Sequence, residues 1–332
     1  MSNDKLRKRV LSGIQPTGRL HLGNLIGAVE NWVKLQEKYD CFFFIADLHA
    51  LTTAYDDSKA LKNDIKQVAI DLLSAGLDPG KCVIFRQSDL SEHAEMHLLF
   101  SMITPVSWLE RVPTYKSKMD EIKGKDLSTY GFLGYPVLQA ADILIYKADF
   151  VPVGHDQLPH IELTREIGRR FNYFYGDVFP LPKDLLTDFP TLPGTDGRKM
   201  SKSYNNAIAL SDSPAVIEQK ISTMVTDPAR VKKEDKGHPA ICSVFEFFKI
   251  FAGNKKGTVE KECKAAERGC VACKKELAQY VIKYLEPIHQ KRAELEKSPE
   301  AIDVMLTEGA KKAKIIAAET LFEAKRAMGL LL

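Results

Sequence analysis

The chain has 332 residues, of which 45% are hydrophobic and 27% charged, a composition typical of globular proteins rather than disordered or fibrous ones. A net charge of +3 is compatible with a nucleic-acid partner but does not argue for one. Proteins that bind nucleic acids concentrate positive charge on one face, and a total charge does not show how the charge is distributed. No apolar run reaches the ~20 residues of a membrane span, and residues 1–13 lack the apolar core of a signal peptide, so we expect a cytoplasmic protein without a membrane anchor.

Short apolar runs alternate with helical patterns in the first part of the chain. The runs are nearly continuous in apolar residues, which indicates buried parallel strands, at 9–13, 41–47, 82–86 and 150–153. Helical patterns lie between them at 22–39, 58–76 and 91–103. The alternation predicts an α/β fold, a Rossmann-like doubly wound parallel sheet. Such sheets bind ligands beyond the carboxyl ends of their strands, so functional residues are expected just after 11, 47, 86 and 153.

Strand signals stop after about residue 205. Amphipathic helical patterns rich in Lys, Glu and Ala follow at 214–225, 275–296 and 309–328. We therefore expect a catalytic domain over 1–204 and an α-helical domain over 205–332.

The segment SGIQPTGRLHLGNLIGAV, residues 12–29, runs from a strand through a turn into a helix that begins near Leu22. The backbone N–H groups at the start of such a helix can bind a phosphate group. Gly23 has no side chain, so a nucleotide could lie directly against the backbone. A plain strand-to-helix turn with incidental glycines is the alternative, because such turns are common.

A second segment, GRKMSKSYNN at 197–206, combines three cations with small hydroxyl residues and one glycine. HLGN at 21–24 resembles the HIGH signature of class I aminoacyl-tRNA synthetases, and KMSKS at 199–203 is that class's second signature. QPTG at 15–18, PVLQAADILIY at 136–146 and VPVGHDQLPHIELTREI at 151–167 resemble the tryptophanyl-tRNA synthetases in particular. One departure is Asn24 in place of the final His: its amide can donate a hydrogen bond, but imidazole chemistry is excluded there.

The resemblance implies a tryptophan–tRNA ligase that uses ATP and Mg²⁺. A carboxylate oxygen of L-tryptophan attacks the α-phosphorus, pyrophosphate leaves, and tryptophan passes to the terminal adenosine of tRNA(Trp). The carboxylate is already a nucleophile, so the protein must position the reactants and neutralise phosphate charge. The resemblance assigns catalysis to Lys199, Lys202, Lys116 and His21, although Lys116 could instead be a solvated surface lysine. It assigns ATP binding to Gln15, Pro16, Thr17, Gly23, Asn24, Gly154, His155, Asp156, Leu192, Lys199, Met200, Ser201, Lys202 and Ser203.

Asp142 lies in the apolar segment 136–146, which we interpret as a helix opened by Pro136. A carboxylate in such surroundings is costly without a partner, and an indole N–H, which only donates, is a suitable one. A capping or ion-paired aspartate is the alternative, but Asp142 lies about two turns inside the expected helix. The resemblance adds Gln139, Tyr135, Gln157, His49 and Ser12 to the tryptophan site, with a structural role as the alternative for His49.

Four cysteines, Cys242, Cys263, Cys270 and Cys273, form a C-x20-C-x6-C-x2-C pattern. Four thiolates can bind zinc or a [4Fe–4S] cluster, and plain reduced thiols are a third reading. A single CxxC pair favours iron–sulfur, and some tryptophanyl-tRNA synthetases carry such a cluster in the anticodon-binding domain.

Members of this family are homodimers, so we expect a dimer contact from the segment 97–112, within an insertion near 97–135, with Leu109 as a contact residue. A tyrosyl-tRNA synthetase would also use a buried carboxylate and is one alternative function. A small-metabolite nucleotidyltransferase of the HxGH type would leave KMSKS unused. An RNA-binding regulator without catalysis would typically have lost the lysines or His21 that this chain keeps.

Overall fold

The computed structural model describes residues 7–121, 125–186, 192–232 and 234–331. Within them, a sheet of five parallel strands has the order β3-β2-β1-β4-β5. The strands are β1 Arg9–Ile14, β2 Asp40–Ile45, β3 Cys82–Arg86, β4 Phe150–Val153 and β5 Lys183–Leu186. The predicted α/β class and the first four strands are confirmed. β5 escaped prediction because it is a half-exposed edge strand with the sequence KDLL.

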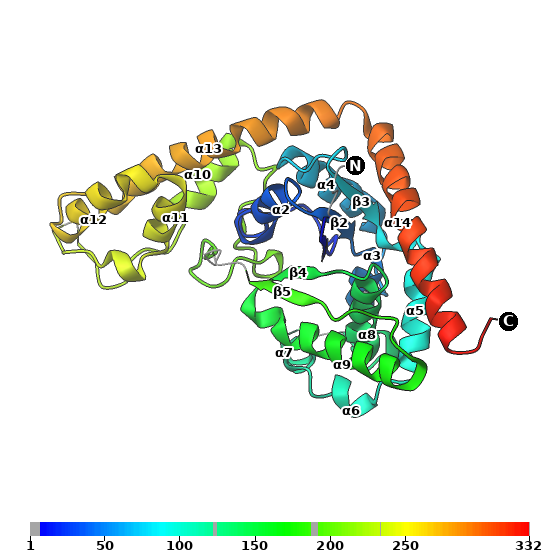
Figure 1. Cartoon of the computed structure of the whole chain (residues 1–332). Coiled ribbons are helices and arrows are strands. Elements are labelled where there is room, and N and C mark those ends of the chain that lie inside the picture. Colours follow the sequence, from blue (N-terminus) through cyan, green and yellow to red (C-terminus); the bar gives the residue numbers. More distant parts are fainter. Residues whose placement is uncertain (1–6, 122–124, 187–191, 233, 332) are drawn as a thin grey trace.

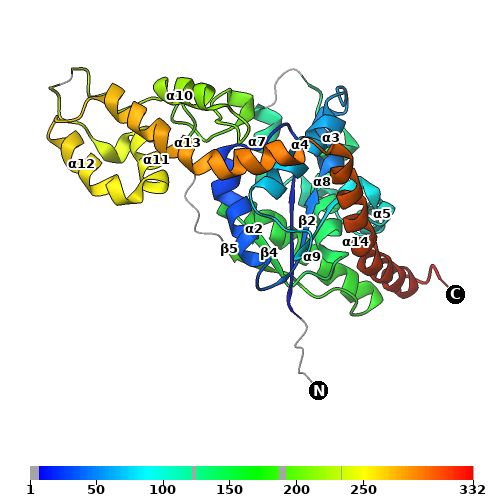
Figure 2. The same cartoon turned by 90° about the horizontal axis from the view of Figure 1, so that it is seen from above.

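Helices cover both faces of the sheet. Four further α-helices of the described chain, within residues 214–295, extend away from it as a separate arm (Figures 1 and 2). In the catalytic part they are α1 Leu22–Asn24, α2 Glu30–Leu35, α3 Asp47–Ala54, α4 Leu61–Ser74, α5 Ser91–Ser101, α6 Val106–Leu109, α7 Pro113–Glu121, α8 Tyr130–Leu144 and α9 Leu158–Tyr175. The π-helical turn η1, Leu25–Val29, joins α1 to α2. The later helices are α10 Pro214–Ser222, α11 Ser243–Phe251, α12 Lys256–Lys264, α13 Cys270–Leu295 and α14 Pro299–Ala327.

The inner strand β2 explains why the sheet is covered on both faces. Its side chains alternate: Phe43 and Ile45 join one hydrophobic cluster, while Phe42 and Phe44 join another on the opposite face. All four are buried. A strand that is apolar on both faces needs a layer on each side, as in doubly wound sheets.

Helix α8 begins earlier than the sequence suggested. Thr129 caps it by accepting a hydrogen bond from the backbone N–H of Phe132, so the helix starts at Tyr130 and Pro136 lies inside it. The interpretation of Pro136 as the first helical residue was therefore wrong. Asp142 consequently lies in the last turn of α8, where the helix dipole disfavours a carboxylate.

Helix α14 returns to the sheet and runs beside its edge strand β3 (Figure 1). A Cβ atom at Gly309 would lie 1.8 Å from the carbonyl oxygen of Ile84, so only glycine permits this approach. Along α14, Leu306 belongs to the cluster on one face of the sheet and Ala313 to the cluster on the other. The helix thus covers the edge of β3, although the expected division at 204/205 placed it in the helical domain.

Helix α13 connects the arm to the catalytic part. Near its end, the guanidinium of Arg292 donates to the carboxylate of Asp71 on α4, and both side chains are buried. The second Asp71 oxygen accepts a hydrogen bond of 2.7 Å from the backbone N–H of Leu20, the residue before HLGN. No helix in the described residues is both long and apolar enough to cross a bilayer.

Candidate active site

A cavity of about 330 Å³ opens where β1, β2 and β4 end, as the rule for doubly wound sheets leads one to expect. It is walled by apolar groups of α2 and the strands, among them Trp32, Phe44 and Val151. It also brings together eight residues that the sequence assigned to the site: Ser12, Gln15, His49, Tyr135, Gln139, Asp142, Gly154 and Gln157.

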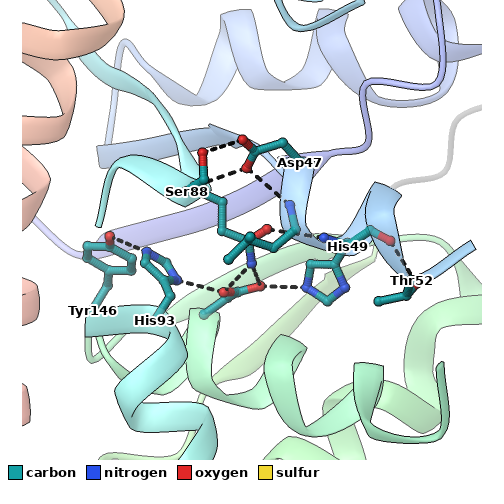
Figure 3. Close-up of polar contacts among 9 residues, drawn as sticks. Asp47, His49, Thr52, Ser88, His93 and Tyr146 are labelled. Carbon is teal, nitrogen blue, oxygen red and sulfur yellow. Dashed lines mark hydrogen bonds and ion pairs between the residues drawn. The ribbon is translucent and has the colours of Figure 1, made fainter. Parts of the chain in front are cut away.

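The Asp142 carboxylate sits at the wall of this cavity and is fully surrounded by donors (Figure 3). His49 Nε2 lies 2.7 Å from Oδ2, and His93 Nδ1 lies 2.6 Å from Oδ1. The Gln87 amide donates to both oxygens, at 2.7 and 2.9 Å. Burial alone would raise the pKa of Asp142, but the hydrogen bonds from His49 and His93 hold that pKa below its ordinary value. The carboxylate is therefore an anionic acceptor in an apolar wall.

The sequence reading missed the residues behind Asp142. Gln87 directly follows β3, at a strand end where functional residues were expected, so this signal was present. His93 and Tyr146 carried no such signal, because their connection to Asp142 depends on how α5 packs against α8.

A second polar cluster lines the same cavity. The Thr114 hydroxyl lies 2.8 Å from the hydroxyl of Tyr135 and 2.6 Å from Nε2 of His160. Thr114 is on α7, the helix that also carries Lys116. Neither Thr114 nor His160 was singled out from the sequence.

A second cavity, of about 380 Å³, lies beside the start of α1 and shares Gln15 with the first. Its lining includes Thr17, His21, Asn24, Ser201, Lys202 and Ser203, which come from the QPTG–HLGN turn and from KMSKS. The two signatures, about 180 positions apart in the chain, therefore meet in space.

His21 and Asn24 cap α1 reciprocally. His21 Nδ1 accepts from the backbone N–H of Asn24 at 3.2 Å, and Asn24 Oδ1 accepts from the backbone N–H of His21 at 3.1 Å. Burial, aided by the nearby Lys202 cation, lowers the pKa of His21 to about 4. At neutral pH this imidazole is uncharged and serves as an acceptor.

Lys202 reaches from the KMSKS segment into the turn before α1. Its Nζ donates to the carbonyl of Gly18 at 2.9 Å and to that of Thr17 at 3.1 Å. Burial lowers the pKa of Lys202, partly offset by Asp64 and Asp71. Met200 anchors the same segment, because its Sδ accepts from the backbone N–H of Gly23 at 3.3 Å.

Several predicted residues lie outside both cavities. Lys199 has a side chain that is 73% exposed, and its Nζ is 3.7 Å from the Asp156 carboxylate. Lys116 is exposed on α7, and Leu192 is packed in the core. In the described part of the chain, the remaining predicted residues that line neither cavity are Pro16, Gly23, His155, Asp156 and Met200.

The four cysteines of the arm lie near one another. Cys242 precedes α11, Cys263 is on α12, and Cys270 and Cys273 begin α13. Burial raises the pKa of Cys273 to about 12, Arg268 offsets this in part, and Cys242 and Cys263 raise it further. Across 7–121, 125–186, 192–232 and 234–331, no three Cys, His, Asp or Glu side chains are grouped so as to hold a metal ion.

Comparison with known proteins agrees with this geometry. The family described as class I tRNA synthetases (W and Y) matches residues 3–286. The tryptophan–tRNA ligases of Thermotoga maritima and Aquifex aeolicus are 54% and 45% identical to the chain, covering 97% of it and 99% and 100% of their own lengths. A crystal structure of tryptophanyl-tRNA synthetase from Campylobacter jejuni, complexed with ADP and tryptophan, superimposes with a TM-score of 0.87 at 36% identity, covering 97% of this chain and 99% of that one. The chain therefore belongs to the tryptophanyl-tRNA synthetases, a branch of the class I family that serves tryptophan and tyrosine.

Proposed function

We propose that this chain is an ATP-dependent tryptophan–tRNA ligase in which Asp142 reads the indole N–H. The observation that carries this proposal is the buried, ionised carboxylate in the wall of a mainly apolar cavity. An indole N–H only donates, so an acceptor-only group is its matching partner. The curated relatives named above are tryptophan–tRNA ligases and span nearly the whole chain.

The amino acid would lie with its ring against Trp32 and Gln139 and its ammonium group among polar groups at the other end. Tyr135 and Gln157 line the cavity and are our candidates for holding the α-ammonium group. The tryptophan carboxylate would then point toward Gln15, which the two cavities share. Ser12 and Gly154 line the first cavity as well.

ATP would bind with its phosphates in the second cavity. It enters as its Mg²⁺ complex, so the ion is part of the substrate. Lys202 would exchange the carbonyls of Thr17 and Gly18 for phosphate oxygens, while Ser201 and the backbone N–H groups at the start of α1 donate hydrogen bonds. Neutral His21 cannot repel or protonate the substrate. Lys199 and Lys116, both exposed, would join the phosphates only when their segments close over ATP.

The reaction needs no protein nucleophile. A tryptophan carboxylate oxygen forms a bond to the α-phosphorus, the bond from that phosphorus to the bridging oxygen breaks, and pyrophosphate leaves. The terminal adenosine of tRNA(Trp) then takes the tryptophanyl group and AMP is released. We place this activity in the cytoplasm, where tRNA is charged.

The first test is exchange of labelled pyrophosphate into ATP, with tryptophan and tyrosine side by side. Exchange with tryptophan alone is expected, and Asp142→Ala should lower kcat/KM for tryptophan at least about 100-fold, because a charged acceptor is lost. Glu260→Ala, which removes a partly exposed carboxylate on α12, in the arm and far from both cavities, is the matched control. Exchange with tyrosine, or an Asp142→Ala enzyme as active as the parent, would contradict the proposal.

We also propose that Cys242, Cys263, Cys270 and Cys273 hold a [4Fe–4S] cluster. In support, Cys242 and Cys270 lie close enough to Cys263 to add to the rise that burial causes in the pKa of Cys263, and the Arg230 guanidinium lies 3.9 Å from Cys263 Sγ, which suits an anionic group. A bound cluster would supply a cross-link between the starts of α11 and α13 and helix α12, and so brace the surface that we expect to read the anticodon. Zinc or plain thiols are the competing states.

Anaerobic purification followed by metal analysis separates these states. We expect a brown protein with about four irons per chain, colourless and iron-free as Cys263→Ser but still brown as Cys41→Ser. Stoichiometric zinc in a colourless parent protein would replace the iron reading with the zinc one, and absence of both metals would leave plain thiols.

A homodimer is the proposed assembly. Exposed apolar side chains lie along α5, α6 and the start of α8: Leu98, Met102, Val106 and Tyr130. Leu109, suggested from the sequence as a contact residue, is instead buried in the core of its own chain. A charged residue there would disturb folding rather than test an interface.

The dimer is tested by sedimentation of Met102→Glu, which we expect to shift the chain to monomers. Val231→Glu is the matched control, because Val231 is an exposed apolar residue between α10 and α11, away from these elements. A Met102→Glu protein that sediments as the parent does would rule out this surface.

A further inference from the structure

The Asp142 carboxylate has two sides in the structure. On the cavity side, His49 donates to Oδ2 and lines the cavity. On the other side, Gln87 and His93 donate to Oδ1, and among the described residues neither lines the cavity. Figure 3 labels His49 and His93, which reach the carboxylate from α3 and α5. Oδ1 is thus held by the deep donors alone, whereas Oδ2 is shared between the deep Gln87 and the cavity-lining His49.

His93 is the most enclosed of these donors. Its side chain is completely buried, with Nδ1 at 2.6 Å from Asp142 Oδ1 and Nε2 at 2.8 Å from the hydroxyl of Tyr146. Burial, with Asp142 and Glu92 nearby, raises the pKa of Tyr146 well above its ordinary value, so its hydroxyl keeps its proton. That proton can be donated to Nε2 of a neutral His93, which leaves the ring proton on Nδ1, directed at Asp142. The hydroxyl thereby selects the tautomer.

The number of lone pairs on the Asp142 carboxylate makes the orientation of the His93 ring important. A carboxylate offers about four lone-pair positions, and here four contacts occupy them: two on Oδ1 and two on Oδ2. The indole N–H must displace one contact. The longest, Gln87 to Oδ2 at 2.9 Å, can be given up while Gln87 keeps its 2.7 Å bond to Oδ1. Gln87 can give up its contact with Oδ2 in this way only while His93 stays hydrogen-bonded to Oδ1.

We propose that His93, set in its Nδ1–H tautomer by Tyr146, is a positioning residue that anchors Oδ1 of Asp142 and so presents Oδ2 to the indole N–H. The side chains of His93 and Tyr146 do not touch the substrate. They act on amino-acid selectivity through Asp142, and the inference rests on the proposed role of Asp142. Their loss should weaken preference for a substrate with an N–H group, rather than activation in general.

The test compares tryptophan with benzothienylalanine, in which sulfur replaces the indole N–H. Pyrophosphate exchange yields the ratio of the two kcat/KM values for each enzyme. His93→Leu should lower the parent's ratio about tenfold or more, because a hydrogen bond to a charged group is lost. Tyr146→Phe, which removes one hydroxyl, should lower it less, and His93→Asn, which keeps a donor near Nδ1, should restore most of the ratio. KM for ATP should stay unchanged throughout.

His289→Asn is the control, because His289 lies on α13, outside both cavities and apart from the residues that surround Asp142. It should keep the parent's ratio. Equal losses for both substrates in His93→Leu and Tyr146→Phe would overturn the proposal and leave His93 a purely structural residue. If His93→Leu does not fold, Tyr146→Phe decides alone. Asp142→Asn separates the two claims: an unchanged ratio there removes Asp142 as the reader, and this inference with it.

Discussion

The two ends of the site are built in opposite ways. At the tryptophan end, the Asp142 carboxylate is fully buried and bonded on both oxygens before any substrate arrives. At the phosphate end, the Lys199 side chain is 73% exposed, and its ion-pair partner among the described residues is Asp156, 3.7 Å away. Lys202 is held, but by two backbone carbonyls that phosphate oxygens can replace.

The difference follows from what each end must do. Selecting an indole requires a fixed acceptor in a buried part of the cavity wall, where a wrong substrate leaves polar groups without hydrogen-bond partners. Neutralising a triphosphate that changes charge during the reaction requires cations that can move with it. We therefore expect changes at the tryptophan end to alter selectivity and KM for tryptophan, and changes at the phosphate end to alter kcat and the response to ATP.

The largest expected effect that separates the two ends is that of Lys202→Ala. Loss of this cation should lower kcat for pyrophosphate exchange about 10²–10³-fold, the usual cost of one transition-state donor, while KM for tryptophan stays the same. Lys249→Ala is the control, because Lys249 is a half-exposed lysine of the arm that pairs with Glu246. An equal rise in KM for tryptophan would show that the two ends are not separate.

His21 should make the phosphate end sensitive to acid. Its pKa is about 4 in the folded chain and 6.5 in the unfolded one, so between these values the unfolded chain binds more protons. The contribution of neutral His21 to the free energy of unfolding is therefore full above pH 6.5. It falls by about 3 kcal/mol as the pH drops toward 4. Urea unfolding of His21→Gln should show a correspondingly smaller loss over this window.

The exposed His155, changed to Gln, is the control for that measurement. It should follow the parent protein at every pH. A His21→Gln protein with the parent's pH dependence would show that His21 is not the group that resists protonation.

Thr114 should matter at the tryptophan end. Thr114→Val removes the hydroxyl that contacts Tyr135 and His160 and leaves their polar groups without it. We expect KM for tryptophan to rise about tenfold with little change in kcat, and Thr114→Ser, which keeps the hydroxyl, to behave nearly as the parent. Equal effects of Val and Ser would point to packing by the methyl group instead.

Salt should produce the smallest effect and still separate the ends. The Debye length falls from about 8 Å at physiological ionic strength to about 3 Å at 1 M, so exposed cations such as Lys199 are screened while the buried Asp142 is not. KM for ATP should rise a few-fold between these conditions, and the preference for tryptophan over benzothienylalanine should stay constant. A parallel change in both would contradict the comparison.

The sequence could predict what local pattern controls. Continuous apolar runs marked the four inner strands, and a carboxylate in an apolar run marked Asp142 as a buried group that needs partners. The partners Gln87 and His93 lie some 50 residues away. Gln87 follows a strand end, where a functional residue was expected, but His93 meets Asp142 only because α5 packs beside α8.

The errors have the same origin. Leu109 is apolar whether it faces a partner or its own core, so composition could not tell the two apart. Pro136 suits a first turn, yet the cap at Thr129 starts the helix earlier. Helix α14 has an amphipathic pattern that suits an arm equally well, and only the contact of Gly309 with Ile84 reveals its place.

The contact between α14 and β3 also matters while the chain is being synthesised on the ribosome. Helix α14 covers the edge of β3, although it follows that strand by some 200 residues in the chain. Until α14 emerges from the ribosome, the hydrogen-bonding edge of the sheet is open to other chains, a recognised route to aggregation. A nascent chain stalled before Pro299 should therefore depend on chaperones far more than a chain that includes α14.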